Sequence, residues 1–70
     1  MTEKQLLKRM GLRIKQLRTE KGLSQNALGV EINMEKSNLS RLESGSVNPR
    51  FLTLYKVAKS LDVPVSELFQ

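Results

Sequence analysis

Residues that end helices recur at short intervals along this chain of 70 residues. Gly22, Asn33 and Gly45 tolerate the positive φ with which helices commonly end, and Pro49 and Pro64 stop a helix from continuing through them. Between these positions apolar residues recur every three or four residues, which is the helical period. The pattern predicts five helices joined by tight turns, with no strand.

The first helix is expected over Thr2 to Lys21, with Thr2 as its N-terminal cap. Gly11 weakens the helix propensity of this segment. Leu12 points away from the apolar side, while Arg18 lies at its border, where a long side chain reaches inward with its charged head paired. The residues expected to face the core from this helix are Leu6, Leu7, Met10, Ile14 and Leu17.

Two short helices follow, separated by a turn at Asn33. Ser24 caps the second helix, and the third runs from Lys36 to Ser44, where Gly45 ends it. The outer side of the third helix is polar and carries almost no acidic residue. The residues expected to face the core from these two helices are Leu28, Ile32, Leu39 and Leu42.

A loop over residues 46–49 leads to a fourth helix, with Phe51 packed at its entrance. The helical pattern ends at Asp62 and Val63, and Pro64 suits the first turn of a short last helix. The residues expected to face the core from the fourth helix are Leu54, Val57, Ala58 and Leu61.

The composition excludes several classes of function. Residues 1–70 suffice for one small domain, which buries only about 60% of its unfolded surface and has no room for a deep enzyme cleft. Without Cys or His, the chain offers no disulfide, no zinc site of the usual kind and no imidazole base. We therefore expect no enzyme activity, cofactor, metal or small-molecule ligand. No apolar run reaches the roughly 18 residues of a membrane span and no secretory signal is present, so we expect a cytoplasmic protein with no membrane partner.

The net charge of +5 suggests an anionic partner such as nucleic acid. Residues 1–22 carry all of this excess, whereas residues 23–70 are neutral overall. Lys4, Lys8 and Lys15 share one flank of the first helix and are expected to contribute only long-range steering. The alternative is that these charges simply keep a small protein soluble.

Residues 24–49, SQNALGVEINMEKSNLSRLESGSVNP, resemble the helix-turn-helix family of phage repressors and Cro proteins, the XRE-like regulators. The resemblance starts with the Ser-Gln-x-x-Leu pattern and extends to both sides, covering about residues 10–69. It implies an all-α, five-helix, lambda-repressor-like domain whose second and third helices, within residues 24–44, form the DNA-binding motif. The matching positions are Ser24, Gln25, Leu28, Leu39, Ser40, Arg41, Leu42, Glu43, Gly45, Asn48 and Pro49.

The resemblance implies roles for individual residues. The base-reading positions of the family correspond to Lys36, Ser37, Asn38 and Arg41. The chemistry agrees, because Arg and Lys recognise guanine O6 and N7, Asn holds a base edge or a phosphate, and Ser allows close approach. The positions that contact the DNA backbone correspond to Gln25, Ser44, Asn48 and Arg50.

Arg18 and Glu43 have an architectural role in this resemblance. The matching residues of the family form a shielded ion pair that ties the first helix to the third. We therefore assign both residues to the fold and not to DNA contact.

The sequence departs from the family pattern at several positions. Asn33 replaces the usual Gly, Gly29 the usual Ala, and Ala27 the Glu of a capping box. Glu35 lies at the start of the third helix. A carboxylate there is repelled by DNA phosphates unless it accepts a hydrogen bond from a cytosine amino group or points away from the DNA. Leu12 occupies a usually polar position, and residues 1–9 extend beyond the typical start of the family.

The sequence thus predicts a regulator that binds operator DNA as a homodimer. The candidate dimer contacts are Leu12, Leu6, Leu7, Val65, Leu68 and Phe69. Two alternatives stay open, namely a protein-interaction module of the antitoxin or adaptor kind on the same fold, and a nonspecific nucleic-acid binder that uses the basic first helix.

Overall fold

The computed structural model describes residues 1–70. It contains four α-helices, a short 3₁₀-helix at the C-terminus and no strand, which confirms the all-α prediction and shows that the last helix is of the tighter 3₁₀ type. None of the helices combines the length and apolarity that crossing a membrane requires. The elements are α1 (Glu3–Glu20), α2 (Gln25–Ile32), α3 (Lys36–Ser44), α4 (Phe51–Ser60) and η1 (Val65–Phe69).

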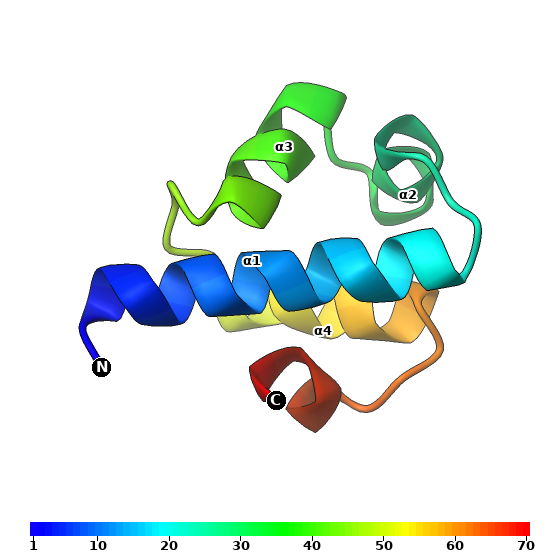
Figure 1. The fold of residues 1–70 in the computed structure, drawn as a ribbon. Coiled ribbons are helices and arrows are strands. Elements are labelled where there is room, and N and C mark those ends of the chain that lie inside the picture. Colours follow the sequence, from blue (N-terminus) through cyan, green and yellow to red (C-terminus); the bar gives the residue numbers. More distant parts are fainter.

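Helix α1 runs through the middle of the molecule (Figure 1). In the view of Figure 1, α2 and α3 lie above α1, η1 lies below it, and α4 lies behind it. Helix α1 packs against α3 and η1, and α4 packs against α2 and η1. The first turns of α1 extend past the other elements at one end of the molecule (Figure 1).

The helix ends follow the local sequence. The Thr2 hydroxyl accepts from the Gln5 backbone N–H at 3.1 Å, and the Gln5 side chain accepts in return from the Thr2 N–H at 2.9 Å. This reciprocal capping box fixes the start of α1. Ser24 caps α2 in the same manner through the Ala27 N–H. Asn33 (φ 56°) and Gly45 (φ 78°) end α2 and α3 in the left-handed conformation, as predicted.

The core is formed by residues of all five elements. Two core predictions were wrong. Leu6 is 45% exposed, because the turn of α1 that carries it extends past the neighbouring elements. Phe51 is 65% exposed, because it shares a side of α4 with exposed Tyr55 and not with the core residues. Leu7 is half-buried against the core, whose members are Met10, Ile14, Leu17, Leu28, Ile32, Leu39, Leu42, Leu54, Val57, Ala58, Leu61 and Leu68.

Gly11 has a structural role beyond its low helix propensity. A Cβ atom at this position would lie 2.3 Å from the backbone oxygen of Glu43 and 2.7 Å from that of Leu42. Helices α1 and α3 therefore approach each other backbone to backbone at Gly11. This contact is closer than any side chain permits.

We predict that Gly11→Ala destabilises the protein. Helix propensity alone would make this substitution favourable by about 1 kcal/mol. The added methyl group instead has to push the α3 backbone away, and overpacking of this kind costs about 1–3 kcal/mol. Urea unfolding measures the difference, with the exposed α1 substitution Lys15→Ala as a control. A Gly11→Ala protein more stable than the wild type would contradict the close helix contact.

Candidate nucleic-acid interface

Helix α3 is held in place by a tight turn after α2. Asn33 adopts the left-handed conformation, and the Met34 N–H donates to the Gly29 carbonyl at 2.8 Å. A Cβ atom at Gly29 would lie 2.4 Å from the Met34 carbonyl oxygen, so this departure from the family's Ala accompanies a closer turn. Leu39 and Leu42 bury the inner side of α3. The opposite side of the helix is consequently turned to solvent.

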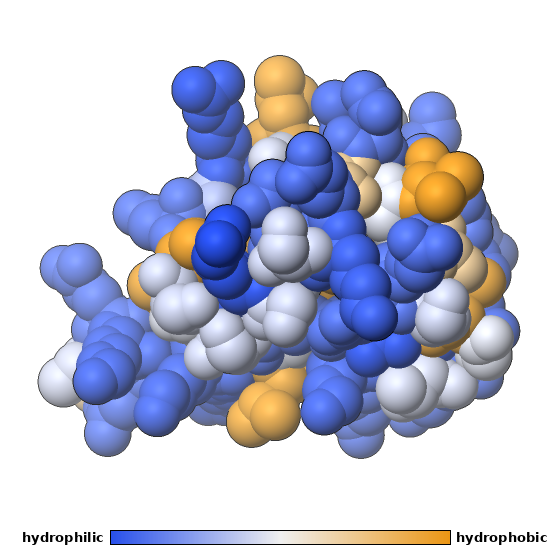
Figure 2. Space-filling model, turned by 90° about the horizontal axis from the view of Figure 1, so that it is seen from above, coloured by the Kyte–Doolittle hydropathy of each residue, from blue (hydrophilic) through white to orange (hydrophobic).

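The exposed side of α3 is polar and positively charged. All four base-reading candidates lie on it and are exposed, namely Lys36, Ser37, Asn38 and Arg41. Nη1 of Arg41 donates to Oδ1 of Asn38 at 3.0 Å, so these two side chains form one unit. Neither Lys36 nor Arg41 has a carboxylate oxygen within 4 Å. Viewed from the side of α2 and α3, the surface is mostly hydrophilic, with apolar atoms in separate small patches (Figure 2).

Glu35 stands at the entrance of this helix. It is exposed and occupies the N-cap position of α3, but its side chain makes no capping hydrogen bond. The carboxylate also has no cationic partner within 4 Å. A free carboxylate at this position limits which groups can approach the first turn of α3.

The four candidates for DNA-backbone contact lie at the start of α2, at the end of α3 and in the segment after α3, and they differ in exposure and hydrogen bonding. Asn48 and Arg50 are exposed, and Arg50 is the N-cap residue of α4. The Ser44 hydroxyl donates to the Arg41 carbonyl at 2.9 Å and lies 2.8 Å from the Ser46 hydroxyl. Gln25 is half-buried at the first turn of α2.

Gln25 makes a contact that its sequence position did not indicate. Its Nε2 donates to Oε1 of Glu43 at 3.0 Å, so the amide is oriented by a carboxylate of α3. One Nε2 proton and the side-chain oxygen remain available. No signal within α2 predicts this contact, because it depends on where Glu43 lies in space.

The structure contains an ion pair between Arg18 and Glu43. Nε of Arg18 lies 2.7 Å from Oε2 of Glu43, and Nη2 lies 3.0 Å from Oε1. Nη1 of Arg18 also donates to the Leu23 carbonyl at 2.7 Å. Arg18 is 7% exposed and Glu43 is 6% exposed, and no buried side-chain nitrogen or oxygen lacks a partner. The pair thus joins α1 to α3 and, through Gln25 and Leu23, to the start of α2.

Comparison with known proteins places this arrangement among helix-turn-helix proteins. The HTH_3 family model, described as helix-turn-helix, matches residues 14–68. The control protein C.MunI of Mycoplasma sp is 36% identical over 62 residues, which cover 87% of this chain and 84% of that protein. The uncharacterised HTH-type transcriptional regulator y4dJ of Sinorhizobium fredii is 39% identical over 61 residues, which cover 87% of this chain and 79% of that protein.

A solved structure shows the same arrangement of helices. The restriction-modification controller protein C.AhdI from Aeromonas hydrophila superposes with a TM-score of 0.87 and 36% sequence identity. The superposition covers 90% of this chain and 96% of that one. The similarity therefore includes the position of α3 relative to α1.

We predict that Glu43→Gln strongly destabilises the fold. The substitution leaves the buried Arg18 guanidinium without a counter-charge, which costs about 3–5 kcal/mol. In a domain of this size, such a loss lowers the melting temperature by about 12 °C or more.

The matched control is Glu67→Gln. Glu67 pairs with Arg13 at 3.4 Å, and the two side chains are 29% and 21% exposed. A partly exposed pair at this longer distance contributes far less than the buried one, about 0–1 kcal/mol, so this variant should melt close to the wild type. Equal melting temperatures for the two variants would contradict an architectural role for Glu43.

Proposed function

Because this chain belongs to the helix-turn-helix family HTH_3 and is a sequence-specific DNA-binding transcription regulator, we propose that it acts by inserting α3 into the major groove of an operator. This family membership confirms the resemblance to phage-repressor and Cro-type regulators. The proposed regulator acts by occupying DNA, without catalysis, and works in the cytoplasm, where its operator is accessible.

The observation that supports this proposal is the outer side of α3. Leu39 and Leu42 hold the inner side against the core, while the exposed side presents hydrogen-bond donors without carboxylate partners. In the proposed complex Arg41 pairs with O6 and N7 of a guanine, and Asn38 steadies the guanidinium through the bond to Nη1. Lys36 reaches a neighbouring base edge, and Ser37 allows the helix to approach closely.

The proposed backbone contacts position α3 but do not read sequence. Gln25, oriented by Glu43, donates its remaining Nε2 proton to a phosphate next to the N-terminus of α2. On the other side of α3, Ser44, Asn48 and Arg50 follow one another along the chain and approach the sugar-phosphate backbone. Glu43 in this way supports phosphate contact without touching DNA.

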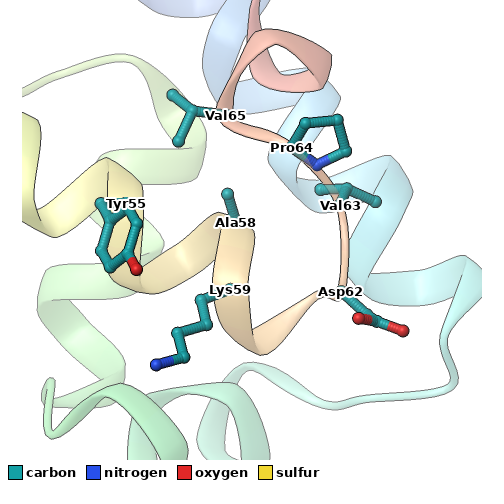
Figure 3. Close-up of a pocket in the computed structure, with 7 residues that line it drawn as sticks. All are labelled: Tyr55, Ala58, Lys59, Asp62, Val63, Pro64 and Val65. Atoms are coloured by element: carbon teal, nitrogen blue, oxygen red, sulfur yellow. The ribbon is translucent and has the colours of Figure 1, made fainter.

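We further propose that the protein binds as a homodimer through α4 and η1. Phe51, Leu52 and Tyr55 expose 65%, 67% and 47% of their surface in the first turns of α4. Tyr55 and Val65 lie on either side of a hollow between α4 and the start of η1 (Figure 3). Exposed apolar surface of this kind is typical of protein–protein contacts. None of these residues belongs to the base-reading candidates of α3.

The other apolar candidates fit a dimer less well. Leu68 is fully buried in the core and is unavailable for a contact. Leu12 is 65% exposed, but it lies beside Lys8, Arg9 and Arg13. A two-fold contact centred on Leu12 would bring these like charges together, which is unfavourable.

Selection of bound sequences from random duplex DNA tests the operator proposal. We expect a two-fold symmetric consensus with half-sites about 34–36 Å apart, or a multiple of that spacing. Arg41→Ala should weaken binding to this consensus by about 1–3 kcal/mol for each half-site and relax one position in each half-site. Arg9→Ala, which removes the same charge from α1, should retain the consensus. Absence of measurable DNA affinity would instead favour a protein-interaction module, and binding without any consensus would favour a nonspecific binder.

Tyr55→Glu tests the dimer surface. A carboxylate placed in an apolar contact is desolvated without a partner, so we expect the dimer dissociation constant to rise at least about tenfold. Sedimentation equilibrium measures this change, with Leu12→Glu as the matched control that leaves the dimer intact. Loss of the dimer in Leu12→Glu but not in Tyr55→Glu would place the contact on α1.

A further inference from the structure

The first two turns of α1 are a rigid extension of the domain. They precede residue 14, where the match to the family begins. The capping box between Thr2 and Gln5 keeps them helical from Glu3 onward. The first of these turns extends past the other helices (Figure 1). The two turns therefore form a helical arm with a fixed direction.

The C-terminal end of α3 lies against this arm. A Cβ atom at Gly11 would touch the backbone of Glu43, and one at Gly45 would lie 2.6 Å from Cα of Lys8. Glu43 therefore lies beside Gly11, and Gly45, which is farther toward the C-terminus, lies beside Lys8, which is farther toward the N-terminus of α1. Helix α3 points toward the N-terminus of α1, and its exit loop over residues 46–49 begins beside Lys8.

Helical geometry then places Lys4 on the same side. Lys4 precedes Gly11 by seven residues, which is about two turns, so both residues project from nearly the same side of α1. Lys4 lies about 10 Å farther along the helix, past the end of α3. Lys8 projects about 60° from Gly11. Both lysines accordingly face the side of α1 on which α3 lies.

The two lysine charges are uncompensated. Lys4 and Lys8 are exposed, and neither has a carboxylate oxygen within 4 Å. Glu3, the acidic residue nearest in sequence, projects about 100° away from Lys4 around the helix. Hydrophilic side chains extend from this end of the molecule on the α2 and α3 side (Figure 2). A polyanion lying along α3 would meet both ammonium groups.

We propose that Lys4 and Lys8 bind DNA phosphates next to the half-site occupied by α3. This inference rests on the proposed function, since it requires α3 to lie in the major groove. It extends the proposed backbone contacts from Asn48 in the exit loop to the arm of α1. The contact is independent of base sequence, because ammonium groups on flexible stems recognise phosphate as point charges. The two lysines contribute short-range contacts and not only long-range steering.

The salt dependence of binding tests this inference with the double variant Lys4→Gln/Lys8→Gln. Each phosphate contact contributes about 0.9 to the slope of log K against log salt concentration. We expect the slope to decrease by about 1.8 for each bound protomer, which is about 3.6 for the dimer, and affinity to fall equally for the selected operator and for random duplex DNA. The wild type's preference for the operator over random DNA should stay unchanged.

The matched control is Arg9→Gln/Lys21→Gln, which removes the same net charge. Arg9 projects from the side of α1 opposite Gly11, and Lys21 donates to the Ser60 carbonyl on the α4 side. This variant should change the slope much less. Equal slopes for the two double variants would overturn the inference, because the lysines would then act only through the net charge of the protein.

Trimming the duplex provides a second readout. On an operator shortened to its half-sites, the phosphates proposed to contact Lys4 and Lys8 are missing. The salt slope of the wild type should then fall to the value that Lys4→Gln/Lys8→Gln shows on the longer duplex. A difference between the two proteins that persists on the trimmed duplex would overturn the proposed location. A wild type with no preference for any DNA sequence would instead contradict the proposed function itself.

Discussion

The buried ion pair between Arg18 and Glu43 determines how the DNA-facing parts of this protein are arranged. Three elements meet at this pair, because Arg18 also bonds the Leu23 carbonyl and Glu43 also accepts from Gln25. Two charges in a low-dielectric interior are stable only when paired and fully hydrogen-bonded, and that condition is met here. The pair therefore fixes the distance between α3 and the N-terminus of α2. In the proposed complex, these two elements engage the same stretch of DNA.

Close contacts between backbones also hold α3 in place. Gly11 and Gly45 bring α3 against α1, and Gly29 brings the turn before α3 against α2. A domain of 70 residues buries few side chains, so direct contact between backbones is an effective way to hold a helix rigidly. A rigidly held α3 can present Arg41 and Asn38 in a defined geometry, and less conformational entropy is then lost on binding.

The charge distribution separates affinity from specificity. In the proposed complex, base reading falls to α3, in a part of the chain that is neutral overall. The positive excess lies in residues 1–22, mostly on α1, where Lys4 and Lys8 lie near the exit of α3. Phosphate contacts raise affinity for every DNA sequence, whereas base contacts distinguish one sequence from another. In the proposed complex these two tasks fall on two helices, which the contact at Gly11 holds together.

Local chemistry made much of the fold predictable from the sequence. Caps such as Thr2 and Ser24, left-handed residues such as Asn33 and Gly45, and the period of the apolar residues act within a few residues of the chain, so they determine helix bounds and most of the core by themselves. The motif around α2 and α3 likewise identified the family and the candidate base-reading residues.

Tertiary structure alone decided the properties that depend on which elements meet. Leu6 and Phe51 have core-like spacing, but no neighbouring element covers them. The contact from Gln25 to Glu43 and the position of Lys8 beside Gly45 join residues far apart in the chain. Periodicity specifies the side of a helix on which a residue lies, but not what lies opposite it. The packing of whole helices settles that partner.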